Sequence, residues 1–249
     1  MRRRTLLAGL AAAPISAPAL AQSDAARTFR FIPNADVTSL DPMSTTSYGV
    51  RNHGHMCWDT LYGPDGSFTM RPQLCEGHTV EDDGLRWTFT LREGPRFHDG
   101  EPVRAADAVA SIERWSRLDT LGQTLRARTA EMRALDDRRF EIRLNARFAP
   151  MLEALGKPSS YPCFVYPERF ARVEPSRPFT EVVGSGPYRF VAAERLQGAR
   201  AVYRRFEGYV PNPRPPSLLG GAKHAHMERV EFLWMPDSGT AAAALQAGE

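Results

Sequence analysis

The fold of this chain is decided by the segment Trp87-Thr88-Phe89-Thr90-Leu91-Arg92-Glu93-Gly94-Pro95-Arg96-Phe97-His98-Asp99-Gly100-Glu101-Pro102. Apolar and polar residues alternate at its start, which predicts a half-buried strand with Trp87, Phe89 and Leu91 on one face. Turns are expected on both sides, at Glu81–Gly84 and again at Gly94-Pro95 and Asp99-Gly100. Helical spacing follows in Ala105, Ala108, Val109, Ile112 and Trp115. Because no part of it forms a catalytic arrangement, the segment predicts a scaffold.

This order of elements resembles family 5 of the bacterial extracellular solute-binding proteins, the peptide- and nickel-binding group that serves ABC importers. Within the segment, the resemblance rests on Trp87, Phe89, Leu91, Arg92, Gly94, Arg96, Phe97, Asp99, Gly100 and Pro102. Further motifs follow in the family's order: Leu40-Asp41-Pro42, Trp58-Asp59-Thr60-Leu61, Gly184-Ser185-Gly186-Pro187-Tyr188, and the element from Glu228 to Gly248-Glu249. The resemblance spans residues 28–249. Arg104 and Thr60 depart from it, since a helix-capping Thr and a Gly are usual there.

The resemblance implies an α/β protein with the periplasmic binding protein-like two-lobe fold, of the class II or cluster C type. Only the first lobe and its inserted domain are expected in this chain. The first lobe is assigned to residues 27–58 and 178–249, as an incomplete mixed sheet with helices, and the inserted α/β domain to residues 59–177. The family normally continues into a further lobe, so we expect a fragment. A truncated gene or an incomplete record would give the same ending.

The implied function is the periplasmic solute-binding component of an ABC importer, for peptides or a similar small solute. Solute would enter an open cleft, the lobes would close about a hinge, and the closed form would dock on the membrane permease. This mechanism requires no catalysis and no cofactor. The alternative from another class is an exported metal- or haem-binding protein that uses the histidines. The sequence does not identify the solute.

The amino terminus has the layout of a secretory signal peptide over residues 1–21. Arg2-Arg3-Arg4 precede an apolar run from Leu6 to Leu20, and Ala19-Leu20-Ala21 forms a cleavage site before Gln22. A permanent membrane anchor is disfavoured, because the run falls short of the roughly 20 apolar residues needed to span a bilayer. The expected location is the periplasm. Arg3-Arg4 also fits a twin-arginine signal, so the export route stays open.

Charge argues against a nucleic-acid partner. The formal net charge of +3 is accounted for by Arg2, Arg3 and Arg4, so the mature part is formally neutral. Its acidic and basic residues are interspersed, as on an ordinary solvated surface. Without a positive field or a clustered basic face, nucleic-acid binding is not expected.

The cysteines and histidines do not form a metal motif. Cys57, Cys75 and Cys163 lack zinc-site spacing and are interpreted as buried small hydrophobes, although one disulfide with a leftover thiol stays open. His53-Gly54-His55 and His224-Ala225-His226 would each place two rings on one side of an extended segment. A metal centre needs three or four converging ligands, so we expect surface or loop histidines and no metal site.

No enzyme emerges from the remaining motifs. Gly184-Ser185-Gly186-Pro187-Tyr188 lacks the features of a phosphate-binding loop and predicts a tight turn entering a strand, with Gly relieving φ constraints. There is no Gly-x-Ser-x-Gly elbow. The acidic pairs Asp82-Asp83 and Asp136-Asp137 are typical of hairpin tips. The four tryptophans fit apolar faces, and Trp58 alone is retained as able to stack on a ligand.

Thr45, Thr46, Ser47 and Tyr48 are the candidate ligand-binding residues. They are small hydroxyl residues and one aromatic in an irregular segment shortly after a strand, and the corresponding segment of the family borders the ligand cleft. Loops carried on a rigid scaffold commonly supply such contacts. A plain surface loop is the competing interpretation.

Other elements are predicted by periodicity and turn residues. A helix is expected over Val50–Thr60, a hairpin at Gly63–Gly66, and mostly loop from Gly156 to Pro187. Strands are expected at residues 28–32, 140–144, 188–192, 199–204 and 229–234. Short and Ala-rich helices are expected at residues 150–155 and after Asp237.

Overall fold

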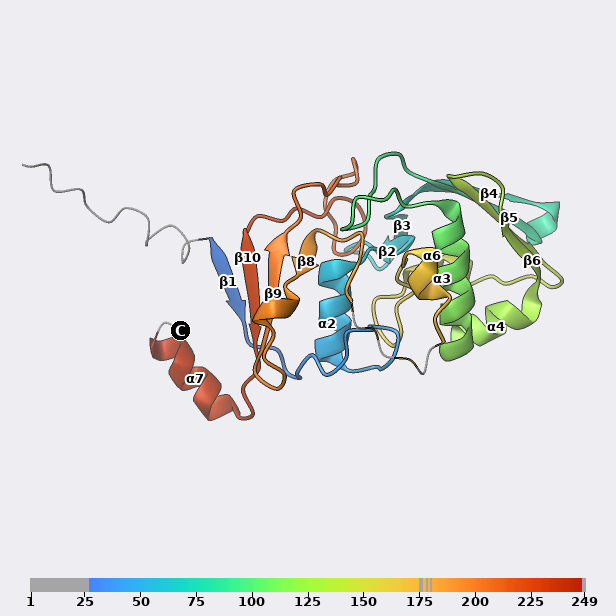
Figure 1. The fold of residues 1–249 in the computed structure, drawn as a ribbon. Helices are drawn as coiled ribbons and strands as arrows, with labels where there is room; N and C mark the ends of the chain where they lie inside the picture. The colour runs from blue at the N-terminus through green and yellow to red at the C-terminus, as the bar shows by residue number, and fades with distance from the viewer. Residues whose placement is uncertain (1–26, 175–176, 178, 180, 248–249) are drawn as a thin grey trace, which may run out of the picture.

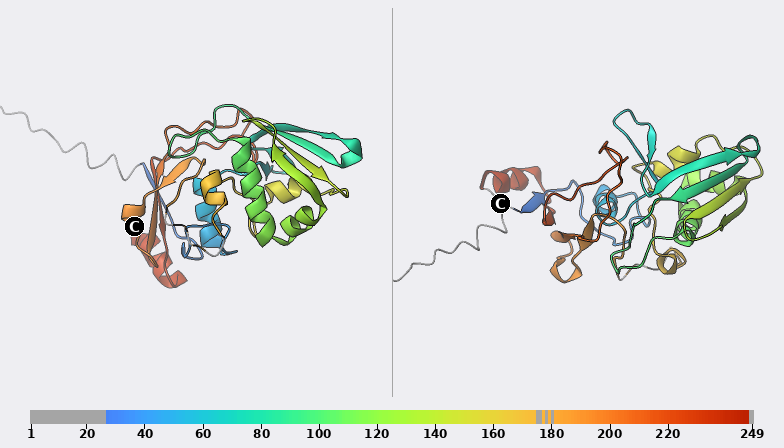
Figure 2. Two further views of the ribbon diagram at one scale, coloured as in Figure 1. Left: turned by 45° about the vertical axis from the view of Figure 1, so that its right-hand side comes forward. Right: turned by 90° about the horizontal axis from the view of Figure 1, so that it is seen from above.

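The computed structural model describes residues 27–174, 177, 179 and 181–247; the expected signal peptide at residues 1–21 lies outside this range. Two four-stranded sheets lie at opposite ends of the molecule, with helix α2 (Tyr48–Cys57) between the first sheet and helix α3 (Ala105–Leu118) in every view (Figures 1 and 2). Helix α7 (Ser238–Ala247) projects from the body beside β1 (Figure 1). None of the described helices is long and apolar enough to cross a membrane.

The first sheet is mixed and draws its strands from both ends of the chain. Its order is β1-β10-β9-β8, with β1 parallel to β10 and the other pairs antiparallel. The strands are β1 (Thr28–Phe31), β8 (Tyr188–Phe190), β9 (Arg200–Arg205) and β10 (Arg229–Leu233). Phe31 lies opposite Phe232, and Phe29 opposite Val230. Because side chains alternate along a strand, these four residues share one apolar face.

The second sheet is antiparallel, with the order β4-β5-β7-β6. Its strands are β4 (Cys75–Glu81), β5 (Arg86–Leu91), β6 (Thr129–Ala134) and β7 (Arg139–Leu144). The strand predicted for Trp87–Leu91 is confirmed as β5, and Phe89 stacks on its cross-strand partner Phe140 with ring centroids 4.9 Å apart. Trp87 is only half-buried, because it lies toward the exposed end of the strand and stacks on His78. Phe89 and Leu91 are the buried anchors of this face.

The remaining elements connect the sheets. A hairpin of β2 (Tyr62–Pro64) and β3 (Met70–Pro72) lies between them, and the helices of this part are α3, α4 (Thr120–Arg128), α5 (Met151–Gly156) and α6 (Glu168–Ala171). Short 3-10 turns occupy Asp82–Gly84 and Ala192–Glu194. The departure at Arg104 is explained by Asp107, whose carboxylate accepts the Arg104 N–H at 2.7 Å and so caps α3 from inside. The predicted buried, unpaired cysteines are confirmed.

A buried ion pair joins the segment after β1 to α3. The Arg114 Nη2 lies 2.6 Å from Asp41 Oδ2, and both side chains are almost inaccessible to solvent. Asp41 Oδ1 also accepts from the Tyr166 hydroxyl at 2.8 Å and from the Met43 N–H at 2.9 Å. This arrangement compensates the buried carboxylate, which would otherwise be costly. It gives Asp41 of the Leu40-Asp41-Pro42 motif a structural role: it holds the chain just before the candidate ligand residues.

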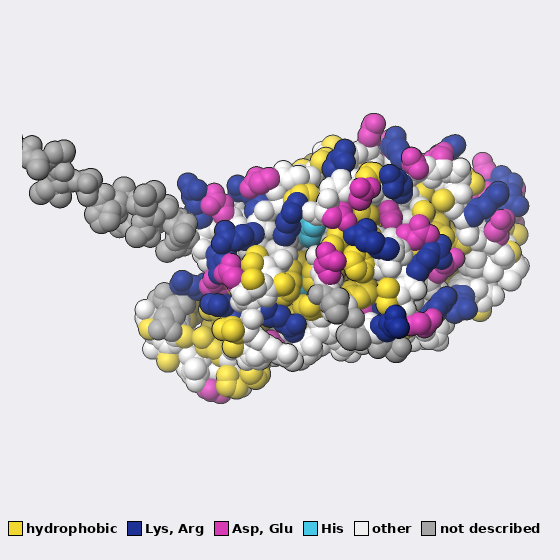
Figure 3. All heavy atoms as spheres, viewed as in Figure 1, with side chains coloured by type: hydrophobic (Ala, Val, Ile, Leu, Met, Phe, Trp, Pro, Cys, Tyr) yellow, Lys and Arg dark blue, Asp and Glu magenta, His cyan; other side chains and the backbone are white. Residues whose placement is uncertain are grey.

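Charges are mixed over the face seen in Figure 3. Lysine and arginine side chains lie beside aspartates and glutamates there. Exposed ion pairs of the described residues include Arg27 with Glu228 and Arg138 with Glu76. This face carries no extended patch of one sign. The interspersed charge pattern of the sequence is therefore preserved in the folded surface of this face.

Candidate functional site

Helix α2 presents two distinct faces. Gly49, Val50, His53, Gly54 and Cys57 are buried. Tyr48, Arg51, Asn52, His55 and Met56 follow the spacing i, i+3, i+4, i+7 and i+8, so they form one stripe along the helix. All members of this stripe except Tyr48 line a groove. We call these five residues the α2 stripe.

The groove lies between the α2 stripe and the apolar face of the first sheet. Its volume is about 820 Å³, in the range of small-molecule sites. Phe29, Phe31, Val230 and Phe232 supply the sheet side, and Tyr188 joins them from β8. Its other lining residues are Pro158, Ser159, Leu219, His224, His226 and Met227. The sheet side therefore offers aromatic and branched apolar surface, while the helix side offers polar groups.

The four predicted ligand residues lie where the chain enters α2. Ser47 precedes the first turn of the helix and makes no side-chain capping bond, and its N–H donates to Thr45 Oγ1 at 3.3 Å. Thr46 is exposed, and half of the Tyr48 surface is accessible. The helix begins two residues earlier than the predicted Val50, so Tyr48 belongs to it. The structure places Tyr48 at the head of the α2 stripe, while none of the four residues lines the groove itself.

Arg51 links Tyr48 to the groove. Its guanidinium carbon lies 4.4 Å from the centre of the Tyr48 ring. Nε and Nη2 both donate to Asn52 Oδ1, at 3.3 and 3.0 Å, and Nη1 donates to Ser159 Oγ at 3.3 Å. All of these partners are neutral. Among the described residues, no carboxylate lies within 4.0 Å of this guanidinium.

The histidines of α2 correct the sequence interpretation. His53 and His55 lie on a helix, so their side chains point to different sides rather than to one. His53 is buried against the Tyr203 hydroxyl at 2.9 Å, and desolvation lowers its pKa to about 3. His55 contacts the Pro158 carbonyl at 3.0 Å, and burial, reinforced by the nearby Lys223 charge, lowers its pKa to about 4. The interpretation of His53-Gly54-His55 as extended chain rested on the alternation of the two histidines about Gly54. It was wrong because all three residues belong to α2.

Metal binding finds no support in the described part of the chain. His55, His224 and His226 all line the groove, and the His224 and His226 ring centroids are 6.0 Å apart. Yet no group of three His, Cys, Asp or Glu side chains among the described residues is arranged to hold a metal ion.

The Gly184-Ser185-Gly186 turn packs directly on the end of α2. A Cβ at Gly184 would lie 1.8 Å from the Cys57 carbonyl oxygen, and one at Gly186 would lie 2.6 Å from the Cys57 carbonyl carbon. Neither glycine has a positive φ. The chain bends at residues 185–187 directly before β8, and the glycines are needed for close approach rather than for backbone freedom.

His98 fastens this turn from the other side. The backbone N–H of His98 donates to the Gly184 carbonyl at 2.7 Å. The ring nitrogen Nδ1 accepts the Gly184 backbone N–H at 3.3 Å. Nε2 lies 3.0 Å from the Gly186 carbonyl, so it must carry the ring proton. His98 comes from the segment that decides the fold, which gives that segment a direct part in positioning α2.

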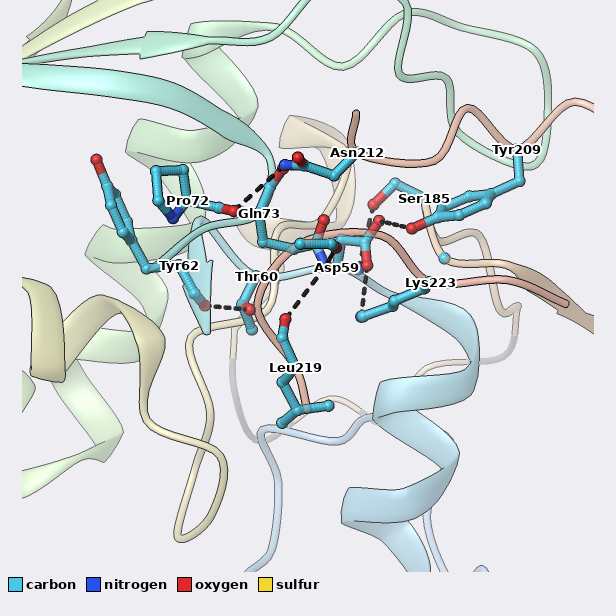
Figure 4. Close-up of polar contacts among 12 residues, drawn as sticks. Asp59, Thr60, Tyr62, Pro72, Gln73, Ser185, Tyr209, Asn212, Leu219 and Lys223 are labelled. Atoms are coloured by element: carbon cyan, nitrogen blue, oxygen red, sulfur yellow. Dashed lines mark hydrogen bonds and ion pairs between the residues drawn. The ribbon is translucent and has the colours of Figure 1, made fainter. Parts of the chain in front are cut away.

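The long segment before β10 is anchored by a buried polar cluster. Asp59 is fully buried and pairs with Lys223 Nζ at 2.6 Å and with the Tyr209 hydroxyl at 3.1 Å (Figure 4). Asn212 donates to the Gln73 carbonyl, and Gln73 Nε2 donates to the Leu219 carbonyl at 3.2 Å. Sequence reasoning missed this cluster, because its members are up to 164 residues apart. It holds the stretch that carries His224, His226 and Met227 against the groove.

Comparison with known proteins identifies similar sequences and folds. The model of the bacterial extracellular solute-binding proteins, family 5 middle region, matches residues 69–249. A probable peptide ABC transporter periplasmic-binding protein of Sinorhizobium fredii is 36% identical over all of this chain and 47% of its own length. The glutathione-binding protein of Salmonella typhi is 27% identical over 97% of this chain and 44% of its own length. The chain thus spans about half the length of the curated relatives it matches.

A solved structure shows the same fold. The structure of a periplasmic binding protein of A. tumefaciens R10 in complex with agropinic acid superimposes with a TM-score of 0.72 at 22% identity. The match covers 89% of this chain and 42% of the other. At this identity the likeness establishes architecture alone. It confirms the expected α/β fold of the periplasmic binding protein type, with part of that fold present here.

Proposed function

The chain belongs to family 5 of the bacterial extracellular solute-binding proteins, and from this membership we propose that it carries one wall of the solute site of an ABC importer. The solute is a peptide or a similar small molecule, as the names of its relatives suggest. Binding proceeds by closure of two lobes and involves no catalysis. A ligand that contacts both lobes only in the closed state favours that state.

The observation that supports this proposal most strongly is the position of the α2 stripe. Tyr48 was selected from sequence as a ligand residue, and its helical neighbours Arg51, Asn52, His55 and Met56 line a groove of suitable size. Thr45, Thr46 and Ser47 offer hydroxyl groups at the entrance to the same helix. We propose that these four residues contact the polar backbone of the solute, while the groove receives apolar parts.

The wider assignment follows from the family and the amino-terminal sequence. The protein acts in the periplasm, after removal of residues 1–21, and delivers solute to a membrane permease. Export by the twin-arginine route is part of the proposal because of Arg3-Arg4. Residues 27–58 and 178–249 form the first lobe, and residues 59–177 the inserted domain; the composition of the two sheets is in keeping with this division.

Small molecules that co-purify with the exported protein, identified by mass spectrometry, test the proposal. Calorimetric titration with an identified solute should then show at least tenfold weaker binding for Tyr48→Ala. Phe68→Ala is the matched control, because Phe68 is an exposed aromatic at the tip of the β2–β3 hairpin and 77% of its surface is accessible. Absence of any bound solute, or equal effects of the two substitutions, would refute the proposal.

A further inference from the structure

The Arg51 guanidinium is held in place by neutral partners, and no carboxylate among the described residues neutralises its charge. A guanidinium has five N–H donors, and three are used on Asn52 and Ser159. Stacking on Tyr48 fixes the plane of the group. One N–H on each terminal nitrogen is left without a protein acceptor among the described residues. The half-buried Arg229, by contrast, pairs with the carboxylates of Glu194 and Glu231.

No acidic side chain is found among the described residues that line the groove beside Arg51. Its lining residues include Arg51, His55, His224 and His226 but no Asp or Glu. The nearby Lys223 is already paired with Asp59. Burial keeps His55 uncharged at neutral pH, since its pKa is lowered to about 4. Among the described residues that line the groove, Arg51 therefore carries the only permanent charge, and it lies beside an apolar sheet face.

We propose that this groove selects solutes that carry a carboxylate next to an apolar side chain, with Arg51 binding the carboxylate. A planar guanidinium with two free N–H groups matches a carboxylate, and the carboxylate would supply the missing counter-charge. The apolar group packs on Phe29, Phe31 and Phe232. A peptide with an apolar carboxyl-terminal residue has this chemistry. This inference rests on the proposed function, because it specifies the solute of the same site.

Two probes separate the contribution of the carboxylate to binding from that of the apolar ring. N-acetyl-phenylalanine and N-acetyl-phenylalaninamide share the apolar ring and differ in charge. NMR titration of the protein at neutral pH should show that the acid binds about fivefold more tightly than the amide. This preference should disappear in Arg51→Gln and persist in Arg139→Gln, since Arg139 is an exposed arginine paired with Asp136 on the second sheet. Raising the salt concentration should weaken the binding of the acid and leave the binding of the amide unchanged.

The outcomes are distinct. Equal binding of acid and amide by the unaltered protein would overturn the carboxylate assignment while leaving solute binding intact, and this comparison needs no variant to fold. An acid preference that survives in folded Arg51→Gln would also overturn it. Binding of neither probe, together with no co-purifying solute, would overturn both the inference and the proposed function. A dimer that covers the groove and excludes both probes would show that a second copy of the chain is the occupant, contrary to the inference.

Discussion

At the scale of single residues, His98 connects pH to stability. The ring nitrogen Nδ1 of His98 accepts the Gly184 N–H. Protonation of Nδ1 would replace this acceptor with an N–H that points at the Gly184 N–H. Burial is the main cause that lowers its folded-state pKa from 6.5 to about 4. Between these values the unfolded chain binds the proton and the folded chain does not. The stabilisation is therefore complete above pH 6.5 and is lost as pH falls toward 4.

We predict that His98→Gln flattens the pH dependence of unfolding in this window. Each histidine that titrates only when unfolded contributes a slope of about 1.4 kcal/mol per pH unit. Urea denaturation between pH 4.5 and 6.5 should show this slope reduced by about that amount in the variant. His226→Gln is the matched control, because it replaces an exposed histidine that lies outside the Gly184 turn. An unchanged slope in His98→Gln would mean that His98 is protonated in the folded protein.

Arg114 and Asp41 form the buried pair that fixes the segment before α2. Arg114→Met should lower the free energy of unfolding by about 3–5 kcal/mol, because Asp41 would remain buried without its counter-charge. Arg139→Met removes an exposed partner of Asp136 and should have little effect. Chemical denaturation at pH 7 compares the two variants, and similar losses would contradict the burial of the Asp41–Arg114 pair. No sequence pattern predicts this contact between residues 73 positions apart.

At the scale of elements, local patterns predicted strands better than helix faces. Alternation of apolar residues was sufficient for β5 and β7, because strand period and burial agree there. Helix α2 was predicted with its start two residues late, and the spacing of His53 and His55 was interpreted as extended chain. The α2 stripe becomes visible only with the correct period. Strands β4 and β6 were missed, since few of their residues are buried and neither shows clear apolar alternation.

The contact between α2 and the Gly184 turn yields an element-scale prediction. Gly184→Ala should destabilise the protein by about 3 kcal/mol or more, because the new methyl group would overlap the Cys57 carbonyl oxygen. Gly77→Ala, in β4, is the matched control, since a Cβ there meets no atom within 4 Å. Thermal and urea unfolding measure both. Equal stability of the two variants would contradict the close packing of the turn on α2.

At the scale of the whole molecule, the family resemblance predicted the architecture and periodicity did not. Apolar alternation and turn residues predict individual strands and helices, but they do not say that β1 pairs with β10, 201 residues later. The groove likewise combines α2, the strands β1, β8 and β10, and the stretch anchored by Asp59. Thr45–Tyr48 were selected by resemblance, whereas Arg51 was missed because a lone arginine in a helix carries no recognisable pattern.

The central claim is that solute binds against the amino-terminal part of α2 and the apolar face of the first sheet. Hydrogen–deuterium exchange of the protein, with and without its co-purifying solute, tests this claim most directly. Amide exchange should slow in residues 45–56 and 224–232 and remain unchanged in β5 and β7 of the second sheet. Slowed exchange confined to the second sheet, with residues 45–56 unaffected while solute is bound, would contradict the account.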